Sequence, residues 1–339
     1  MADLLLAGLD IGGTKSLAVA VSVPATTGGG DAAVVEGSIV ATVRRATEGG
    51  DAVLRSIADT LSELADAAGV AVDGFGAVGV GIPGLVDRQA GTVRHAVNLA
   101  LGDEPLALAD HLGDLARAPV VVDNDVNVAA VGAASALGCQ GDLAYLSVGT
   151  GVAAGFVLGG RIRQGAHGAA GEIGHLPVDP SGPLCECGQR GCLEAVASGT
   201  AIAKRWPSPR SEAASAASEL LAAAAAGDGV AAEVRDEVAG YLAGAVALIA
   251  QTVDPQTIVL GGGVAEAGAP LLDAVVAALH ARAERSPVLA ALDLAGRVAL
   301  VPEGVPAGAL GAALLARARL TAYSARIAAD GAREATRGP

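Results

Sequence analysis

Short apolar runs ended by glycine recur along the chain, and they have the length of β-strands. Residues 4–9 and 17–23 flank one glycine turn, and residues 143–148 and 152–158 flank another. Apolar runs of this length between turn residues predict strands. Two strand–turn–strand units about 140 residues apart suggest an internally duplicated architecture, with chance similarity of short segments as the alternative.

Between and after these hairpins, helical apolar spacing alternates with further short strands. Helices are predicted over residues 50–68, 106–115, 128–137, 211–226, 231–250, 270–282 and 308–319. Further strands are predicted over residues 76–82, 119–122, 257–260 and 298–301. Alternating strands and helices predict an α/β protein, and 339 residues are enough for two domains.

Composition and charge narrow the range of partners. Apolar residues make up 52% of the chain but aromatic residues only 2%, so the core must consist of Val, Leu, Ile and Ala. The net charge of −14 disfavours a nucleic-acid or anionic-membrane partner, because phosphate groups require a basic surface. A small anionic ligand remains compatible with this charge.

Neither the beginning of the chain nor its uncharged runs predict membrane insertion. The first ten residues carry an acid and no basic leader, unlike a signal peptide. Residues 143–160 are interrupted by glycines and are interpreted as two strands. Residues 238–253 are shorter than the ~20 residues that a span requires and are interpreted as a buried helix. We therefore expect a cytoplasmic protein.

Three of the four cysteines, Cys185, Cys187 and Cys192, fall within eight residues, and His175 precedes them. Three thiolates and one imidazole form the Cys₃His set of a closed tetrahedral zinc site. The alternative is a disulfide, but Cys185 and Cys187 are too close to bridge without strain, and nothing indicates an oxidising compartment. We predict structural zinc, with Glu172 and Glu194 held beside it.

Three glycine-rich turns could expose backbone N–H groups to phosphate oxygens. In Asp10-Ile-Gly-Gly-Thr-Lys15, the groups are those of Gly12, Gly13 and Thr14. This turn lacks the spacing of a Walker loop, and a strand follows it, unlike a dinucleotide fingerprint. An ordinary hairpin is the alternative. The turn Gly149-Thr150-Gly151 and the run 261–263 would supply the other phosphate and nucleoside contacts.

A polar cluster, Asp123-Asn124-Asp125-Val126-Asn127, joins a predicted strand to a helix. A helix N-cap needs only one such residue, so four polar side chains favour a site over simple capping. A carboxylate here could accept a hydroxyl proton while Asn124 orients a substrate.

Taken in order, the Asp10–Lys15 turn, the Asp123–Asn127 cluster, Gly171-Glu-Ile-Gly-His175 and the cysteine segment 185–194 resemble the ROK family of repressors and sugar kinases. The resemblance runs from about residue 4 to 316. It implies two actin-like (ribonuclease H-like) α/β domains around a central cleft. The domains would be residues 1–121, with the helix 308–320 packed back on them, and residues 122–307. Residues 321–339 would form a flexible tail.

The resemblance also implies roles for individual residues. Asp125 would be the general base, and the zinc ligand His175 would also face the sugar. The implied sugar ligands are Gly84, Asn98, Asn124, Glu172, His175 and Glu194. The implied nucleotide-side residues are Asp10 (near Mg²⁺), Gly12, Gly13, Thr14, Lys15, Thr150, Gly151, Gly262 and Gly263.

The implied reaction is ATP- and Mg²⁺-dependent phosphorylation of a hexose, with glucose first and fructose, mannose or an N-acetylhexosamine as alternatives. The family's Asn-Leu-x-Gly-Trp segment is here Asn98-Leu-Ala-Leu-Gly-Asp103 without the Trp, which affects the expected sugar most. Polyphosphate is a weaker donor candidate, because relatives that use it generally lack the cysteine cluster. Relatives imply a homodimer or homotetramer.

Two rival functions remain to be compared with the kinase. A repressor would need a helix-turn-helix before the first strand, and we expect none because that strand begins at Leu4. A regulator that binds sugar without catalysis is disfavoured because Asp125 and both phosphate-side turns are present. A panel of hexoses with ATP and Mg²⁺ would separate these functions.

Overall fold

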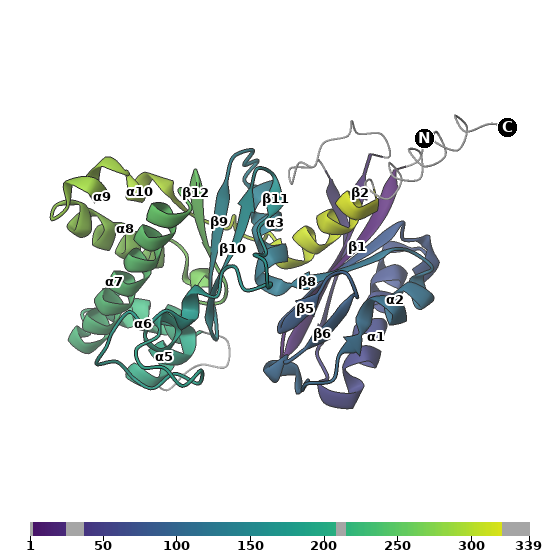
Figure 1. The fold of residues 1–339 in the computed structure, drawn as a ribbon, viewed down its shortest axis with the longest axis horizontal. Helices are drawn as coiled ribbons and strands as arrows, with labels where there is room; N and C mark the ends of the chain where they lie inside the picture. The colour runs from purple at the N-terminus through teal and green to yellow at the C-terminus, as the bar shows by residue number, and fades with distance from the viewer. Residues whose placement is uncertain (1–2, 25–36, 208–214, 321–339) are drawn as a thin grey trace. The chain divides into compact units, whose positions relative to one another are not determined.

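The computed structural model describes residues 3–24, 37–207 and 215–320. It divides into two compact units, each with its own five-stranded sheet (Figure 1). Unit 1 comprises Met1–Gln140 with Gly304–Pro339, and unit 2 comprises Gly141–Glu303.

The sheet of unit 1 has the strand order β3-β2-β1-β4-β8. Its strands are β1 (Leu4–Ile11), β2 (Lys15–Val23), β3 (Ser38–Ala46), β4 (Ala77–Ile82) and β8 (Val120–Asn124). β1 is antiparallel to β2 and parallel to β4, which is in turn parallel to β8. Because parallel strands end at the same edge, the carboxyl ends of β1, β4 and β8 present their following loops together.

Helices cover both faces of this sheet. Because successive side chains of a strand point to opposite faces, one strand contributes to both cores. On β2, Ala18 and Ala20 pack in a core with α1 (Val53–Ala68) and α2 (Leu108–Ala116). Val19 and Val21 pack in a second core with the helix over residues 307–320. The period-two pattern thus positions helices on both faces.

Glycine allows the helix over residues 307–320 to lie directly on the sheet. A methyl group at Gly8 of β1 would clash with the carbonyl oxygen of Ala309, and one at Gly79 of β4 with that of Ala312. This close backbone approach explains why the chain after residue 304 belongs to unit 1.

A small sheet with the order β5-β6-β7 extends unit 1. Its strands are β5 (Leu85–Asp87), β6 (Thr92–Arg94) and β7 (Leu106–Ala107). β5 begins directly after Gly84, at the end of β4. The helix α3 (Asp125–Ala136) follows β8 without a loop.

The sheet of unit 2 repeats the pattern in the order β11-β10-β9-β12-β13. Its strands are β9 (Leu143–Val148), β10 (Val152–Leu158), β11 (Arg161–Ile162), β12 (Thr257–Gly261) and β13 (Val298–Leu300). β9 is antiparallel to β10 and parallel to β12, which is parallel to β13. A central strand with one antiparallel and one parallel neighbour therefore occurs in both units, as the duplicated hairpins predicted.

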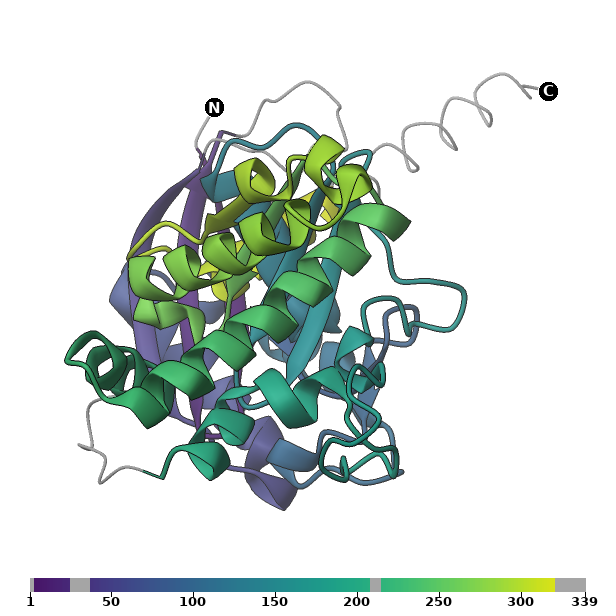
Figure 2. The ribbon, with the colours of Figure 1, turned by 90° about the vertical axis from the view of Figure 1, so that its left-hand side faces the viewer.

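One core packs helices against the sheet of unit 2, where α7 and α8 run side by side (Figure 2). The helices are α4 (Leu193–Ala197), α5 (Gly199–Arg205), α6 (Ala216–Ala225), α7 (Gly229–Thr252), α8 (Ala269–Ala283), α9 (Pro287–Ala291) and α10 (Leu294–Arg297). α7 contains the predicted buried segment, with Val238, Leu242 and Val246 in the core. Within the described ranges, no helix is long and apolar enough to cross a membrane.

Short 3₁₀ helices connect these elements in both units. They are η1 (Gly50–Ala52), η2 (Val72–Gly74), η3 (Val97–Leu99), η4 (Ile173–His175) and η5 (Ala265–Ala267). η3 carries Asn98, and η4 ends at His175.

The structure differs from the predicted elements in several places. The short elements β11, α4, α5, α9 and α10 were not predicted. β3 and the small sheet were not predicted, because β3 is largely exposed and the strands of the small sheet have two or three residues each. The helix predicted over 128–137 begins three residues earlier, at Asp125, because Asn124 caps it. The helix predicted over 106–115 begins at Leu108, because residues 106 and 107 pair in β7. Part of the helix predicted over 211–226 lies outside the described residues.

The division into units differs from the predicted domain boundary at residue 121. β8 pairs with β4, so β8 and the helix that follows it belong to unit 1, and the first segment extends to Gln140. The predicted tail, residues 321–339, lies outside the described residues.

Candidate functional site

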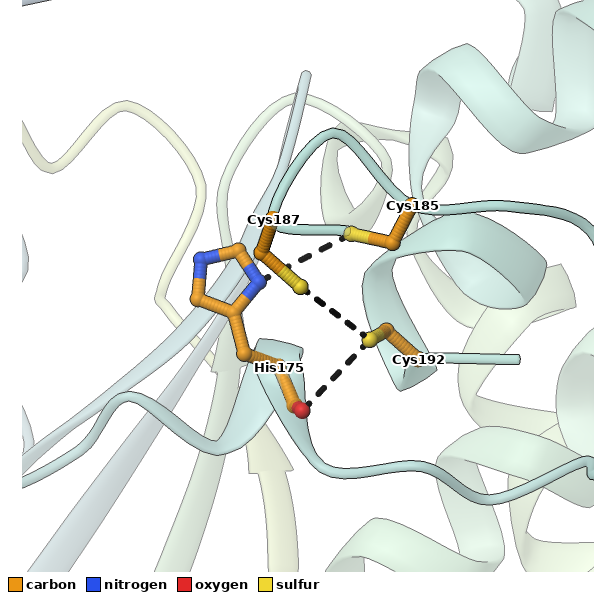
Figure 3. Close-up of side chains that lie close together, drawn as sticks. All are labelled: His175, Cys185, Cys187 and Cys192. Atoms are coloured by element: carbon orange, nitrogen blue, oxygen red, sulfur yellow. Dashed lines mark hydrogen bonds between the residues drawn. The ribbon is translucent and has the colours of Figure 1, made fainter. Parts of the chain in front are cut away.

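The three predicted cysteine ligands and His175 form one cluster in unit 2 (Figure 3). Their ligand atoms all lie within 4.8 Å of one another. Cys185 Sγ is 3.8 Å from His175 Nδ1, and Cys187 Sγ is 3.6 Å from Cys192 Sγ. Four ligands at zinc–ligand distances of about 2.0–2.3 Å in a tetrahedron lie roughly 3.8 Å apart, so this donor set fits zinc.

Backbone turns bring the cysteines together. The N–H of Cys185 donates to the carbonyl of Gln189, and the N–H of Gly188 donates to that of Cys185. Gly188 has φ +89°, which a residue with a side chain rarely adopts. At Gly191, with φ +63°, a methyl group would clash with the carbonyl oxygen of Asp179. Glycine is thus required at these two positions by the fold of this loop.

The thiols of the cluster differ in acidity. The backbone N–H of Gln189 lowers the pKa of exposed Cys187 to about 7, whereas burial raises the pKa of Cys192 to about 12. Zinc binds thiolates, so its binding would displace the Cys192 proton.

The cluster joins directly to the elements that carry His175 and Glu194. Because Nδ1 of His175 faces the sulfur atoms, Nε2 lies on the other edge of the ring. Cys192 occupies the N-cap position of α4, and Glu194 lies in the first turn of that helix. Glu172 precedes η4 and is exposed.

The carboxylate of Glu194 supports the turn between β9 and β10. Its Oε2 accepts a hydrogen bond from the N–H of Val152 at 3.0 Å, and a methyl group at Gly151 would overlap this oxygen. Thr200 Oγ1 donates to the carbonyl of Thr150 at 2.9 Å. A predicted sugar ligand and a predicted nucleotide turn are therefore in direct contact.

The glycine run after β12 lies beside the same turn. Gly262 has φ +81°, and a methyl group on it would lie 2.7 Å from the carbonyl oxygen of Val148. The N–H of Val264 donates to that carbonyl at 2.8 Å. Unit 2 thus brings Gly262 and Gly263 against Val148 and Gly149, which directly precede Thr150.

In unit 1, the turn from Gly12 to Lys15 closes with a hydrogen bond from the N–H of Gly12 to the carbonyl of Lys15 at 3.0 Å. Asp10, before the turn, lies against Gly308 of the C-terminal helix. Burial, reinforced by the charge of Asp125, raises the pKa of Asp10 to about 7, while Lys15 opposes this shift. Asp10 and Asp125 are therefore electrostatically coupled.

The residues of the polar cluster at the end of β8 have different roles. The side chain of Asn124 caps α3 by accepting from the N–H of Val126 at 3.0 Å. Asp123 and Asn127 are buried and bonded to each other at 3.0 Å. Asp125 lies in the first turn of α3 and is half-buried, where the helix N-terminus favours a negative charge.

Gly84 and Asn98 lie at the two ends of the segment that contains the β5–β6 hairpin. Gly84 has φ +105°, and a methyl group there would be 2.7 Å from the carbonyl oxygen of Arg94. Asn98 packs on the first turn, since a methyl group at Gly13 would lie 2.8 Å from its Cβ and carbonyl oxygen.

The predicted site residues therefore fall into two groups, one on each unit. Unit 1 carries Asp10, Gly12, Gly13, Thr14, Lys15, Gly84, Asn98, Asn124 and Asp125; unit 2 carries Thr150, Gly151, Glu172, His175, Glu194, Gly262, Gly263 and the cysteines. Two supporting residues, Thr200 and Arg88, were missed because no sequence motif marks them. Arg88 Nε lies 3.1 Å from Asp123 Oδ2.

These motifs and this fold match one known family. The model of the ROK family matches residues 6–319. The chain belongs to the ROK family. Its fold is accordingly the actin-like (ribonuclease H-like) α/β fold of two domains, as expected.

Three ROK relatives illustrate the similarity. A glucokinase from Halalkalibacterium halodurans is 35% identical over 80% of this chain and 84% of that protein. The structure of a ROK hexokinase from Thermus thermophilus matches with a TM-score of 0.72 and 31% identity, over 94% of this chain and 99% of that one. A ROK family glucokinase from Streptomyces griseus, in complex with glucose and AMPPNP, matches with a TM-score of 0.69 and 29% identity, over 92% and 99%.

Proposed function

We propose that this protein transfers the γ-phosphoryl group of ATP to a hexose, with glucose as the preferred sugar. The observation that carries the proposal is the position of Asp125, half-buried in the first turn of α3 and coupled to Asp10 in a ROK chain. The relatives named glucokinase, and the one complexed with glucose and AMPPNP, support the choice of substrates.

Asp125 acts as the general base that accepts the proton of the attacking sugar hydroxyl. Asn124 offers its amide NH₂ group to the sugar, because its amide oxygen caps α3. The polar side chains of Asn98, Glu172, His175 and Glu194 satisfy sugar hydroxyls that would otherwise be buried without partners. This ligand set suits a polyol more than an apolar substrate.

The glycine turns bind the nucleotide through backbone N–H groups. Such groups stabilise phosphate oxygens without the desolvation cost of extra cationic side chains. Mg²⁺, bound near Asp10, would supply positive charge to the phosphates. The Cys₃His set would hold structural zinc, which would fix His175 so that its Nε2 is free to face the sugar.

A coupled assay for ADP release tests the function, with purified protein, ATP, Mg²⁺ and a panel of glucose, fructose, mannose and N-acetylated hexosamines. We expect the largest kcat/KM with glucose. Turnover confined to another sugar would correct the substrate, and no turnover with any hexose would refute the kinase function. Replacing ATP by polyphosphate tests the donor, with the hexose phosphate measured directly because transfer from polyphosphate releases no ADP.

A further inference from the structure

A buried ion pair links two segments of unit 1. Asp123, the penultimate residue of β8, is 1% exposed. Its Oδ1 accepts from the N–H of Asn124 at 2.8 Å and from Asn127 Nδ2 at 3.0 Å, and its Oδ2 pairs with Arg88 Nε at 3.1 Å. Both carboxylate oxygens thus have protein partners, so Asp123 serves the structure around it.

Arg88 comes from the turn of the β5–β6 hairpin. Asp87 Oδ1 accepts from the N–H groups of Gln89 at 2.9 Å and Ala90 at 3.0 Å, and these bonds define the turn. The Arg88 side chain is 33% exposed, whereas that of Asp123 is 2% exposed. The guanidinium therefore covers a carboxylate that water scarcely reaches.

The ion pair connects groups that the proposed function uses. Gly84 directly precedes the hairpin, and Asn98 follows it in η3. Asn124 and Asp125 directly follow Asp123. We propose that Arg88 is a positioning residue: through Asp123 it holds the general base and the Asn124 amide in register with the hairpin. This inference rests on the proposed kinase function.

The physical reason is the cost of removing the ion-pair partner of a buried charge. Without Arg88, the Asp123 carboxylate loses the guanidinium that pairs with its Oδ2 in a site that water scarcely reaches, and it is then drawn toward water. Because Asp123 Oδ1 holds the N–H of Asn124, such a movement displaces Asn124 and Asp125 together. Phosphoryl transfer is sensitive to small displacements of the base, so the change is expected mainly in kcat.

The test compares Arg88→Met, Asp123→Asn and the double variant with the wild type in the glucose assay. For Arg88→Met we expect kcat to fall about tenfold and the KM for glucose to rise several-fold, with the KM for ATP unchanged. In the double variant, the amide oxygen introduced at position 123 still accepts from the N–H of Asn124, and position 123 carries no charge that needs the guanidinium. The kcat of this variant should therefore recover to within about threefold of wild type.

Arg45→Met is the matched control. Arg45 is 31% exposed, much like Arg88, but its partners Asp59 and Glu63 are about half exposed. For Arg45→Met we expect the kcat and KM of the wild type. Arg88→Lys should recover only part of the activity that Arg88→Met loses, because Lys cannot reproduce the guanidinium geometry.

Thermal denaturation and calorimetric titration with glucose separate positioning from a merely structural role. If Arg88→Met lowers Tm but leaves kcat and glucose affinity unchanged in the folded protein, the proposal is overturned. Additive losses in the double variant would also overturn it. If the wild type phosphorylates no hexose, the proposed function fails first, and the role of Arg88 fails with it.

Discussion

The hairpin turn of unit 1 and that of unit 2 share a backbone pattern but differ in the source of their chemical groups. The first turn, Gly12–Lys15, has a charged residue at its end and another, the half-buried Asp10, just before it. The second, Gly149–Gly151, has no charge of its own. Its carboxylate comes from Glu194, 42 residues beyond Val152, to which it is bonded.

The neighbours that support the two turns differ as well. The first is held by backbone, since the N–H of Thr47 donates to the carbonyl of Thr14 at 3.1 Å and Asn98 packs on Gly13. The second is held by residues of α4 and α5. The N-cap residue of α4 is Cys192, a member of the Cys₃His cluster. The same strand arrangement thus carries different chemical groups in the two units, because different elements pack against each turn.

The largest expected effect concerns Asp125, whose charge acts on Asp10 beside the first turn. Replacing Asp125 by Asn should lower kcat at least about 10²-fold, because the general base is lost while the shape of the side chain is kept. Glucose binding, measured by calorimetry, should change little. Asp114→Asn, an exposed change in α2, is the control. Near-normal turnover of Asp125→Asn would remove this residue from the mechanism.

The support of the second turn can be broken through the metal cluster. Cys187→Ser should lose zinc, measured by elemental analysis, and should raise the KM for glucose by about tenfold or more, because His175 is no longer fixed. Cys139→Ser, outside the cluster, should keep both properties. Metal-free protein with an unchanged KM would mean that zinc has no part in sugar binding.

The raised pKa of Asp10 gives the stability of the protein a pH dependence at the first turn. Folding raises the pKa of Asp10 from 3.8 to about 7. Between these values the folded state binds the proton and the unfolded chain does not, so stability falls as pH rises. Relative to Asp10→Asn, the wild type should lose about 2 kcal/mol of unfolding free energy between about pH 5 and pH 8.

Urea unfolding of both proteins at several pH values measures this difference. Asp114→Asn again serves as the control, and its curve should run parallel to that of the wild type. Parallel curves for Asp10→Asn as well would show that Asp10 does not bind this proton.

The smallest effect compares the two turns directly. A methyl group at Gly13 would press on the backbone carbonyl of Asn98, which cannot move alone, whereas one at Gly151 would press on the end of the Glu194 side chain. Both Gly→Ala changes should raise the KM for ATP several-fold. The increase should be larger for Gly13→Ala, because the backbone yields less readily than a side chain. Equal kinetics for both variants would contradict this difference in support.

Much of the candidate site could be predicted from local sequence. Cys185, Cys187, Cys192 and His175 lie within eighteen residues, and glycines mark the turns between them, so spacing and residue type sufficed. β3 could not be predicted in the same way. It is an edge strand with Ile39 and Val40 exposed, and its apolar pattern is correspondingly weak.

Contacts between segments that are distant in the sequence could not be predicted from sequence patterns. Arg88 is an ordinary turn residue in the sequence, and only the pairing of β8 with β4 places Asp123 within its reach. The same holds for Glu194 and Gly151, and for the return of the chain after residue 304 to unit 1.

The sequence by itself determined the hairpins, the longer helices of the two units, the Cys₃His cluster and the family, because each depends on residue types a few positions apart. Only the tertiary structure decided which carboxylates are buried, which of them share a hydrogen-bond network, and where one unit ends. Those properties depend on desolvation and on contacts across many residues, and no local pattern encodes either.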